Sequence, residues 1–186
     1  QIMSLREDPD FYVLIEVPES VIEARMATRV ICPVCHTSRN TVLLPTQFVE
    51  YDKESGEFYM LCDNAACDKY KTSKMVKKEG DEQGLAPIRN RLDKDGQLIE
   101  KALSLHGVPK VLLRNAIPVG DKDGFDDYEI TPEYSFSYDE STNKVNIAES
   151  SWTIKDDYGE DSHSLLAAPV VISMINQIHG IVTSKG

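Results

Sequence analysis

Apolar and polar residues alternate along parts of the chain, and this period of two predicts β-strands. The clearest stretch is residues 134–138, where three aromatic residues alternate with two serines. After a polar turn, residues 144–148 supply a second run, so we expect a hairpin here. Apolar runs predict further strands at 11–15, 41–51, 57–61 and 111–113, and residues 152–154 are expected to extend the second strand of the hairpin. A further strand is expected at 69–76.

Other segments carry apolar residues at spacings of three and four, which is typical of helices that bury one face. We expect helices over residues 20–29, 97–105 and 168–179. Ser20 and Glu23 stand at the positions of a capping box, which predicts that Ser20 begins the first helix. Pro169 and Gly180 bracket the last helix, whose apolar side is expected to face the core.

The four cysteines form two tight pairs, Cys32-x2-Cys35 and Cys62-x4-Cys67, with 26 residues between them. Each short turn can present two sulfurs to one metal ion, and four soft thiolate ligands favour tetrahedral zinc. Two disulfides are the alternative, which is favoured only in a secreted protein. The sequence therefore predicts one zinc ion bound by Cys32, Cys35, Cys62 and Cys67.

We expect this zinc ion to be structural. Four cysteines leave no coordination position open for water, whereas a catalytic zinc ion normally keeps one. His36 directly follows Cys35 and could compete as a ligand. The preferred interpretation is an exposed or neighbouring side chain outside the coordination sphere.

A cysteine-bearing turn, a hairpin, a second cysteine-bearing turn and a strand follow one another in the order of a zinc ribbon. In such a fold the metal replaces the hydrophobic core that a short segment cannot build. Residues 79–87 are acidic, contain two glycines and end in proline, so they predict a linker. The expected fold class is α+β, a four-cysteine zinc ribbon followed by a small αβββα module. The expected boundaries are 1–29 for an N-terminal strand and short helix, 30–79 for the zinc ribbon and 88–186 for the acidic module.

The net charge narrows the class of partner. The chain has 20 basic and 31 acidic residues, a formal charge of −11, and residues 80–186 are its most acidic part. Such a surface repels nucleic acid and anionic lipid at long range and suits a protein partner with a basic surface. Five lysines follow the second cysteine pair, where they could contact phosphate or, as we prefer, offset the metal centre and protect an edge strand. They are Lys69, Lys71, Lys74, Lys77 and Lys78.

The longest nearly apolar stretch is residues 165–175. A helix that spans a membrane needs about 20 apolar residues, so we expect no membrane insertion. Cysteines suited to metal and the lack of an export signal favour the cytoplasm.

Residues around the cysteines also carry a family resemblance. Cys32-Pro33-Val34-Cys35 is followed by Thr37-Ser38-Arg39, and the second pair lies in Leu61-Cys62-Asp63-Asn64-Ala65-Ala66-Cys67. This part, about residues 30–75, resembles the zinc fingers of phage transcription activators of the Ogr/Delta type. The resemblance implies that the four cysteines are metal ligands, and that the protein contacts RNA polymerase and activates transcription.

Two segments are candidates for a catalytic or a cation-binding site. Ser162-His163-Ser164 places hydroxyl groups beside an imidazole, but adjacent residues rarely act as nucleophile and base. The acidic loop 121–129 does not fit an EF-hand, because Val119 and Ile130 would occupy ligand positions. An irregular Ca²⁺ or Mg²⁺ site is the alternative to a solvated loop, and no catalytic residue is assigned.

The sequence thus predicts a non-enzymatic zinc-binding protein that acts through protein–protein contacts in a larger assembly. One alternative is a phage-like transcription regulator that contacts nucleic acid or RNA polymerase, although the charge disfavours nucleic acid. A second alternative is an enzyme or enzyme subunit that uses the acidic loop and His163.

Overall fold

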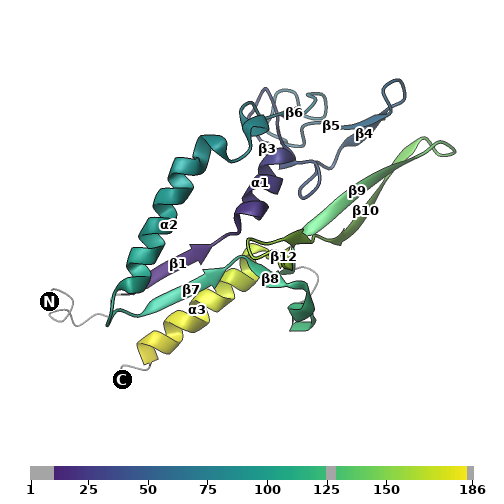
Figure 1. Cartoon of the computed structure of the whole chain (residues 1–186). Coiled ribbons are helices and arrows are strands. Elements are labelled where there is room, and N and C mark those ends of the chain that lie inside the picture. Colours follow the sequence, from purple (N-terminus) through teal and green to yellow (C-terminus); the bar gives the residue numbers. More distant parts are fainter. Residues whose placement is uncertain (1–10, 125–128, 184–186) are drawn as a thin grey trace.

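The computed structural model describes residues 11–124 and 129–183, and it is a mixed α/β structure built from small sheets (Figure 1). The elements follow the chain in this order: β1 (Tyr12–Glu16), α1 (Glu19–Ala27), β2 (Arg29–Ile31), β3 (Ser38–Asn40), β4 (Val49–Asp52), β5 (Glu57–Met60), β6 (Val76–Lys77), the 3-10 helices η2 (Asp81–Gln83) and η3 (Ala86–Ile88), α2 (Arg89–Ser104), β7 (Lys110–Arg114), β8 (Ala116–Pro118), the 3-10 helix η4 (Val119–Gly124), β9 (Pro132–Asp139), β10 (Lys144–Ser151), β11 (Ile154–Lys155), β12 (Asp161–Ser164) and α3 (Ala167–Thr183).

The cysteine segment, residues 30–79, contains two small antiparallel sheets. β2 pairs with β3 on one side and with β6 on the other, and β4 pairs with β5 as the expected hairpin. The strand expected over 69–76 is reduced to β6 and a single bridge between Leu61 and Lys74, because turns occupy most of residues 65–72.

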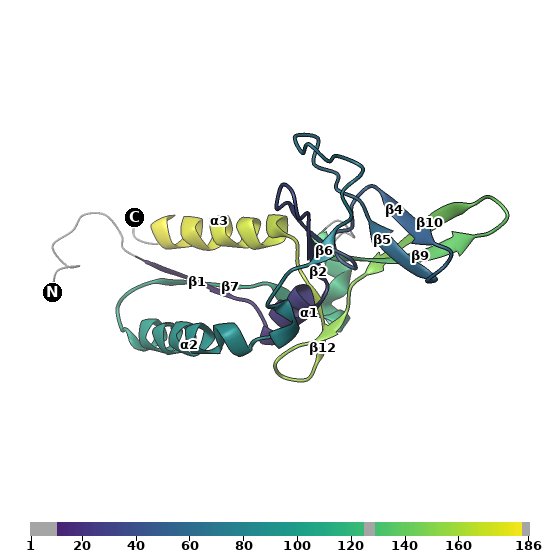
Figure 2. The same cartoon turned by 90° about the horizontal axis from the view of Figure 1, so that it is seen from above.

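The predicted hairpin at 134–148 is confirmed, with Phe136 opposite Ile147 and Tyr138 opposite Val145. Its aromatic face packs against the β4–β5 hairpin, and the two hairpins run side by side in both views (Figures 1 and 2). The Tyr51 and Tyr138 rings stack with centroids 4.3 Å apart, and those of Phe58 and Phe136 lie 5.8 Å apart. The period-two pattern therefore identified the partly buried face of β9, although the hairpin that covers it is distant in sequence.

The opposite end of the molecule is built from β1, β7, α2 and α3, and we call it the helix-flanked end. β1 pairs with β7 in parallel, with Leu14 opposite Leu112. α2 lies on the β1 side and α3 on the β7 side (Figures 1 and 2). Gln177 of α3 receives the Leu112 N–H at 3.0 Å and donates to the Leu112 carbonyl at 2.8 Å, so its amide covers the outer edge of β7.

Two clusters form the core. The first surrounds the cysteines and includes Val30, Val49, Met60 and Met75, with Phe136 of β9 packed on it. The second joins Val21 of α1, Leu43 and Trp152.

The helix predictions were correct in kind and partly wrong in detail. α1 starts at Glu19 after Pro18, without a side-chain cap of its own, so the Ser20 capping box is wrong. The Asp157 carboxylate instead accepts the Glu19 N–H at 3.1 Å and the Ser20 N–H at 3.4 Å. In α3 no residue is fully buried, so the expected core-facing helix is only half covered.

The interval expected to be a linker is structured. Residues 79–87 include η2 and the start of η3, Asp81 pairs with Arg29 of β2, and Leu85 is buried. After it, α2 begins at Arg89 and continues through Gly96. Between α2 and α3 the described residues hold six strands in three sheets, where three strands were expected.

Candidate metal centre

The first cysteine pair lies in the turn between β2 and β3. The Cys32 N–H donates to the Thr37 carbonyl at 3.0 Å, and the His36 N–H donates to the Cys32 carbonyl at 2.9 Å. His36 adopts a left-handed backbone, with φ of 58°, and its side chain is exposed. The turn thus aims both sulfurs inward and leaves the imidazole in solvent.

The second pair lies in the loop after β5. The Cys62 N–H donates to the Ser73 carbonyl at 2.8 Å, and the Lys71 N–H donates to the Cys62 carbonyl at 2.8 Å. Inside the loop, the Asn64 side chain accepts the Ala66 N–H at 3.0 Å. The longer C-x4-C spacing therefore folds as a defined turn rather than a free loop.

The two turns bring all four Sγ atoms within 4.8 Å of one another. Cys32 Sγ lies 3.9 Å from Cys67 Sγ, and Cys35 Sγ lies 3.6 Å from Cys62 Sγ. A tetrahedral ion with bonds of about 2.3 Å to sulfur requires separations of about 3.8 Å. The four predicted ligands therefore form a cluster that could hold a metal ion without large movement of the backbone.

The electrostatics of the site also suit a cation. Hydrogen bonding from Thr37 lowers the pKa of Cys35 to about 6, whereas burial raises the pKa of Cys62 to about 12. Burial disfavours a thiolate unless a positive charge lies beside it. A divalent metal ion supplies that charge and binds the deprotonated form of each sulfur.

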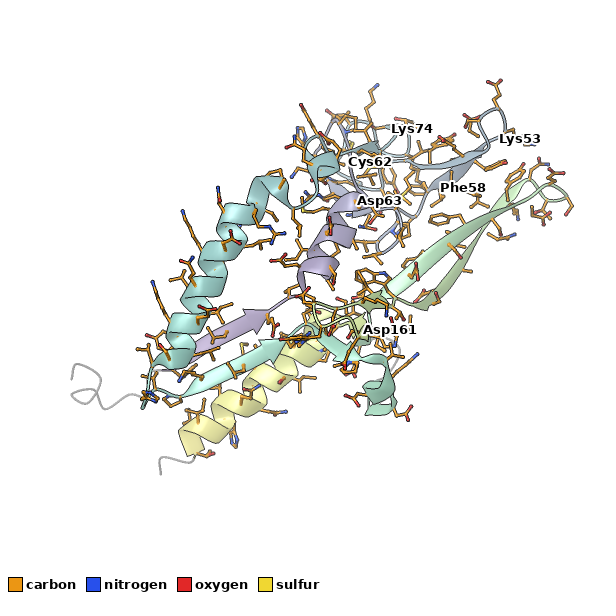
Figure 3. The ribbon with its side chains drawn as sticks, viewed as in Figure 1. Lys53, Phe58, Cys62, Asp63, Lys74 and Asp161 are labelled. Carbon is orange, nitrogen blue, oxygen red and sulfur yellow. The ribbon has the colours of Figure 1, made fainter. Side chains whose placement is uncertain are left out.

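Polar contacts tie the two turns together around the sulfurs. Arg39 of β3 forms an ion pair with Asp63, with Nη2 2.9 Å from Oδ1. The Asn64 amide donates to the Thr37 hydroxyl at 2.9 Å, and Cys35 Sγ lies 3.2 Å from the same hydroxyl oxygen. Figure 3 shows Asp63 beside Cys62 at this end of the molecule. These supports were not predicted, although Thr37, Arg39, Asp63 and Asn64 all lie within four residues of a cysteine.

Two of the lysines after the second pair lie over aromatic rings. Lys71 Nζ lies 4.7 Å from the Phe48 ring centroid and 5.1 Å from that of Tyr70. Lys74 Nζ lies 4.4 Å from the Tyr59 centroid. These cation–π contacts give two of the five lysines a local structural role.

His163 lies on β12 and is 3% exposed. Its Nδ1 lies 2.7 Å from the Trp152 carbonyl oxygen, which makes Nδ1 the protonated nitrogen. The Ser162 hydroxyl donates to Asp156 and the Ser164 hydroxyl to Asn115. Because alternate residues of a strand face opposite sides, neither hydroxyl meets the imidazole.

The acidic loop is only partly described. Asp121 and Asp123 lie in η4 with exposed side chains, and residues 125–128 lie outside the described residues. The solvated loop expected at 121–129 therefore stays a prediction, and the irregular cation site stays its alternative.

Comparisons with protein-family models, with curated proteins and with solved structures found no match to this chain. The resemblance to phage transcription activators therefore rests on the cysteine motifs alone. Within the described ranges, no helix has both the length and the apolar character that a membrane span requires.

Proposed function

We propose that this chain is a non-enzymatic protein that binds one structural zinc ion through Cys32, Cys35, Cys62 and Cys67, and that it works by docking onto a protein partner. The single observation that carries the docking proposal is the surface of α3. The metal supports one end of the molecule, and α3 with β1 offers the other end to the partner.

Zinc is the metal proposed because the ligand set is four sulfurs in a tetrahedral arrangement. Thiolates select soft or borderline cations, and the hard cations Ca²⁺ and Mg²⁺ take oxygen ligands. Four thiolates fill the coordination sphere and leave no position for water. The ion therefore holds the two turns together and is not expected to be catalytic.

α3 is an unusual surface helix for so acidic a chain. Its 17 residues include no Asp, Glu, Lys or Arg, and Ile175 at its centre is 56% exposed. Further exposed apolar residues follow the same side at three- and four-residue spacing: Val171, Ile172 and Val182. Contiguous apolar surface of this kind typically marks a protein interaction site.

The outer edge of β1 is a second open feature of this end. The Tyr12 N–H and the Glu16 carbonyl form hydrogen bonds on the β7 side of β1. Because the backbone groups of successive strand residues point to opposite sides, those of Val13 and Ile15 point away from β7. No strand in the described part of the chain pairs with that edge. Both Val13 and Ile15 also have exposed side chains, which makes the edge a template for an added strand.

A protein explains this surface better than a membrane or a nucleic acid does. Helices that lie on anionic membranes carry Lys and Arg on the polar face, and α3 carries neither. The formal charge of −11 opposes nucleic acid and favours a partner with basic residues around its apolar contact.

Site-specific photo-crosslinking in the native cell tests the docking proposal. A benzoylphenylalanine in place of Ile175 should give a defined adduct with one protein. The control places the same group at Glu140, in the exposed turn between β9 and β10. Adducts that are absent, or that are the same at both positions, would contradict the proposal.

A further inference from the structure

A cavity of about 410 Å³ lies between α1, the β2–β3 strands and the start of β9, at the junction of the cysteine segment with the rest of the chain. One part of its wall is apolar and includes Leu43, Leu44 and Leu166. The same wall holds Arg25, Arg29 and Arg39, and none of its described lining residues is acidic. In a chain with 31 acidic and 20 basic residues, a wall with three cations and no carboxylate is a local exception.

Two of the three arginines already have counter-charges outside the cavity wall. Arg29 pairs with Asp81 at 2.7 Å between Nε and Oδ2, and Arg39 pairs with Asp63 at 2.9 Å. Arg25 is half-buried, and its Nη2 donates to the Ser164 hydroxyl at 3.0 Å. No carboxylate of residues 11–124 or 129–183 forms an ion pair with it, and burial lowers the pKa of its guanidinium.

A partly desolvated cation without a counter-charge is costly, so its retention calls for an anion. The position of Arg25 is well defined, because the Ser164 hydroxyl that receives its N–H donates in turn to Asn115 Oδ1 at 3.3 Å. Ser164 is fully buried. The guanidinium is thus held in place before any ligand arrives.

A buried hydroxyl group next to the cavity also lacks a partner. Thr131 lines the cavity and is 5% exposed, and its Oγ1 has no hydrogen-bond partner among the described residues. Its backbone is satisfied, since its N–H donates to the Ser164 carbonyl at 2.8 Å and its carbonyl accepts the Trp152 N–H at 3.0 Å. Buried hydroxyl groups normally find a partner, so this one is unused.

We infer that this cavity binds a small organic anion, a carboxylate or a phosphate monoester on an apolar body, with Arg25 as the group that receives the acid. The planar guanidinium can donate two parallel hydrogen bonds to a carboxylate or to a phosphate. The leucines receive the apolar body. The volume is within the range of about 300–1,000 Å³ typical of small-molecule sites.

Titration calorimetry of the full, zinc-loaded chain with four probes tests this inference. The probes are benzoate, phenyl phosphate, inorganic phosphate and benzyl alcohol. At least one of the first two should bind one per chain with a dissociation constant of about 1 mM or lower. The other two should bind at least about tenfold more weakly, because each lacks either the apolar body or the acid. The preference between benzoate and phenyl phosphate identifies the acid.

Variants locate the site. Arg25→Gln should weaken the better probe about tenfold or more, whereas Arg91→Gln, an exposed arginine on α2, should leave it within about twofold. Because Arg25→Gln also removes a contact with Ser164, Leu44→Ala is the second variant. The Leu44 side chain lines the cavity and is 58% exposed, so the melting temperature should barely fall while the probe binds a few-fold more weakly.

The inference is overturned if neither organic acid saturates, or if benzyl alcohol binds as tightly as they do. It is equally overturned if both Arg25→Gln and Leu44→Ala bind the better probe as the unaltered chain does.

Discussion

The two ends of this molecule stabilise small sheets in different ways. In the cysteine segment, sheets of two and three strands surround a buried cluster, and the β9–β10 hairpin covers it with aromatic rings. At the helix-flanked end, β1 and β7 form a two-stranded parallel sheet whose strands and helices keep many apolar side chains exposed. Parallel sheets are usually buried on both faces, so the second end is incomplete by the standard of the first.

The comparison separates two sources of stability. The cysteine segment is stabilised by packing against residues distant in sequence and, as we propose, by a metal ion. Within the described residues, the Gln177 amide covers the outer edge of β7 at the second end, and no strand pairs with the outer edge of β1. If a partner completes the second end, changes there should alter association more than folding.

The largest effect is expected from Cys62→Ser. Cys62 is fully buried, and loss of one ligand should remove most of the zinc-binding free energy, which is roughly 10–16 kcal/mol for such sites. We expect less than one bound zinc per chain by elemental analysis and loss of ordered structure in the cysteine segment by NMR.

His36→Asn is the matched control for this change. Asparagine tolerates the left-handed backbone at this position, and the side chain is exposed. The variant should keep one zinc ion with four sulfur ligands by X-ray absorption. If the unaltered protein has a nitrogen ligand that this variant lacks, the four-sulfur assignment is wrong.

A smaller but clear loss is expected from Phe136→Ala, which removes the cover of the cysteine cluster. The ring is partly buried, so we expect a loss of about 2 kcal/mol in the free energy of unfolding, below the value for a fully buried phenylalanine. Ser137→Ala, on the other face of β9, should change it by less than about 0.5 kcal/mol. Equal effects in urea titrations would show that the hairpin does not stabilise the cysteine segment.

At the other end, Gln177→Ala should uncover the outer edge of β7. The change removes two hydrogen bonds to Leu112 and one to Ser173, and because these bonds lie at or near the surface we expect a modest loss of about 1 kcal/mol. The uncovered edge should increase self-association, which sedimentation velocity measures. Asn176→Ala, its exposed neighbour, should have neither effect, and a Gln177→Ala chain that stays as monomeric as this control would contradict the edge argument.

The smallest effect is expected from Asp81→Asn, which breaks the ion pair between η2 and β2. Hydrogen bonding from Arg29 lowers the pKa of Asp81, so the carboxylate is charged at neutral pH. The pair is partly exposed, and we expect a loss of less than about 1 kcal/mol at pH 7. Glu79→Gln removes a charge without a close partner in the described residues and should cost less than Asp81→Asn in the same denaturant series.

Local patterns predicted the cysteine cluster and the aromatic hairpin. Cys32 and Cys35 lie in one turn, and Phe136 alternates with its neighbours, so short windows of sequence contain the signal. The same windows could not show that Phe136 packs on Phe58, because that contact depends on how two hairpins meet.

Contacts between distant residues explain most of the errors. The N-terminal cap of α1 is Asp157, which lies 138 residues beyond Glu19, so the nearby Ser20 and Glu23 pattern was misleading. Residues 79–87 read as a linker because their composition is polar, whereas the Asp81 and Arg29 pair orders them. Similarly, the charged residues and Gly96 obscured the first half of α2 in the sequence, whereas the helix runs without a break from Arg89 through Gly96.

The domain boundaries at 30–79 and 88–186 stay predictions. Tyr138 stacks on Tyr51 and β1 pairs with β7, so contacts cross both boundaries. Zinc removal followed by hydrogen exchange would show whether β9 and β10 keep their protection when the cysteine segment opens.

The pairing of β1 with β7 has a consequence for synthesis on the ribosome. Partners in this register are 98 residues apart, as Glu16 and Arg114 show. At about 5–20 residues per second, β1 waits on the order of 5–20 s for its partner. All four cysteines emerge within that interval, so the cysteine segment can take up metal while β1 is still single. A nascent chain stalled before residue 110 should therefore contain a folded cysteine segment together with an unpaired strand, the state in which a chaperone has most to recognise.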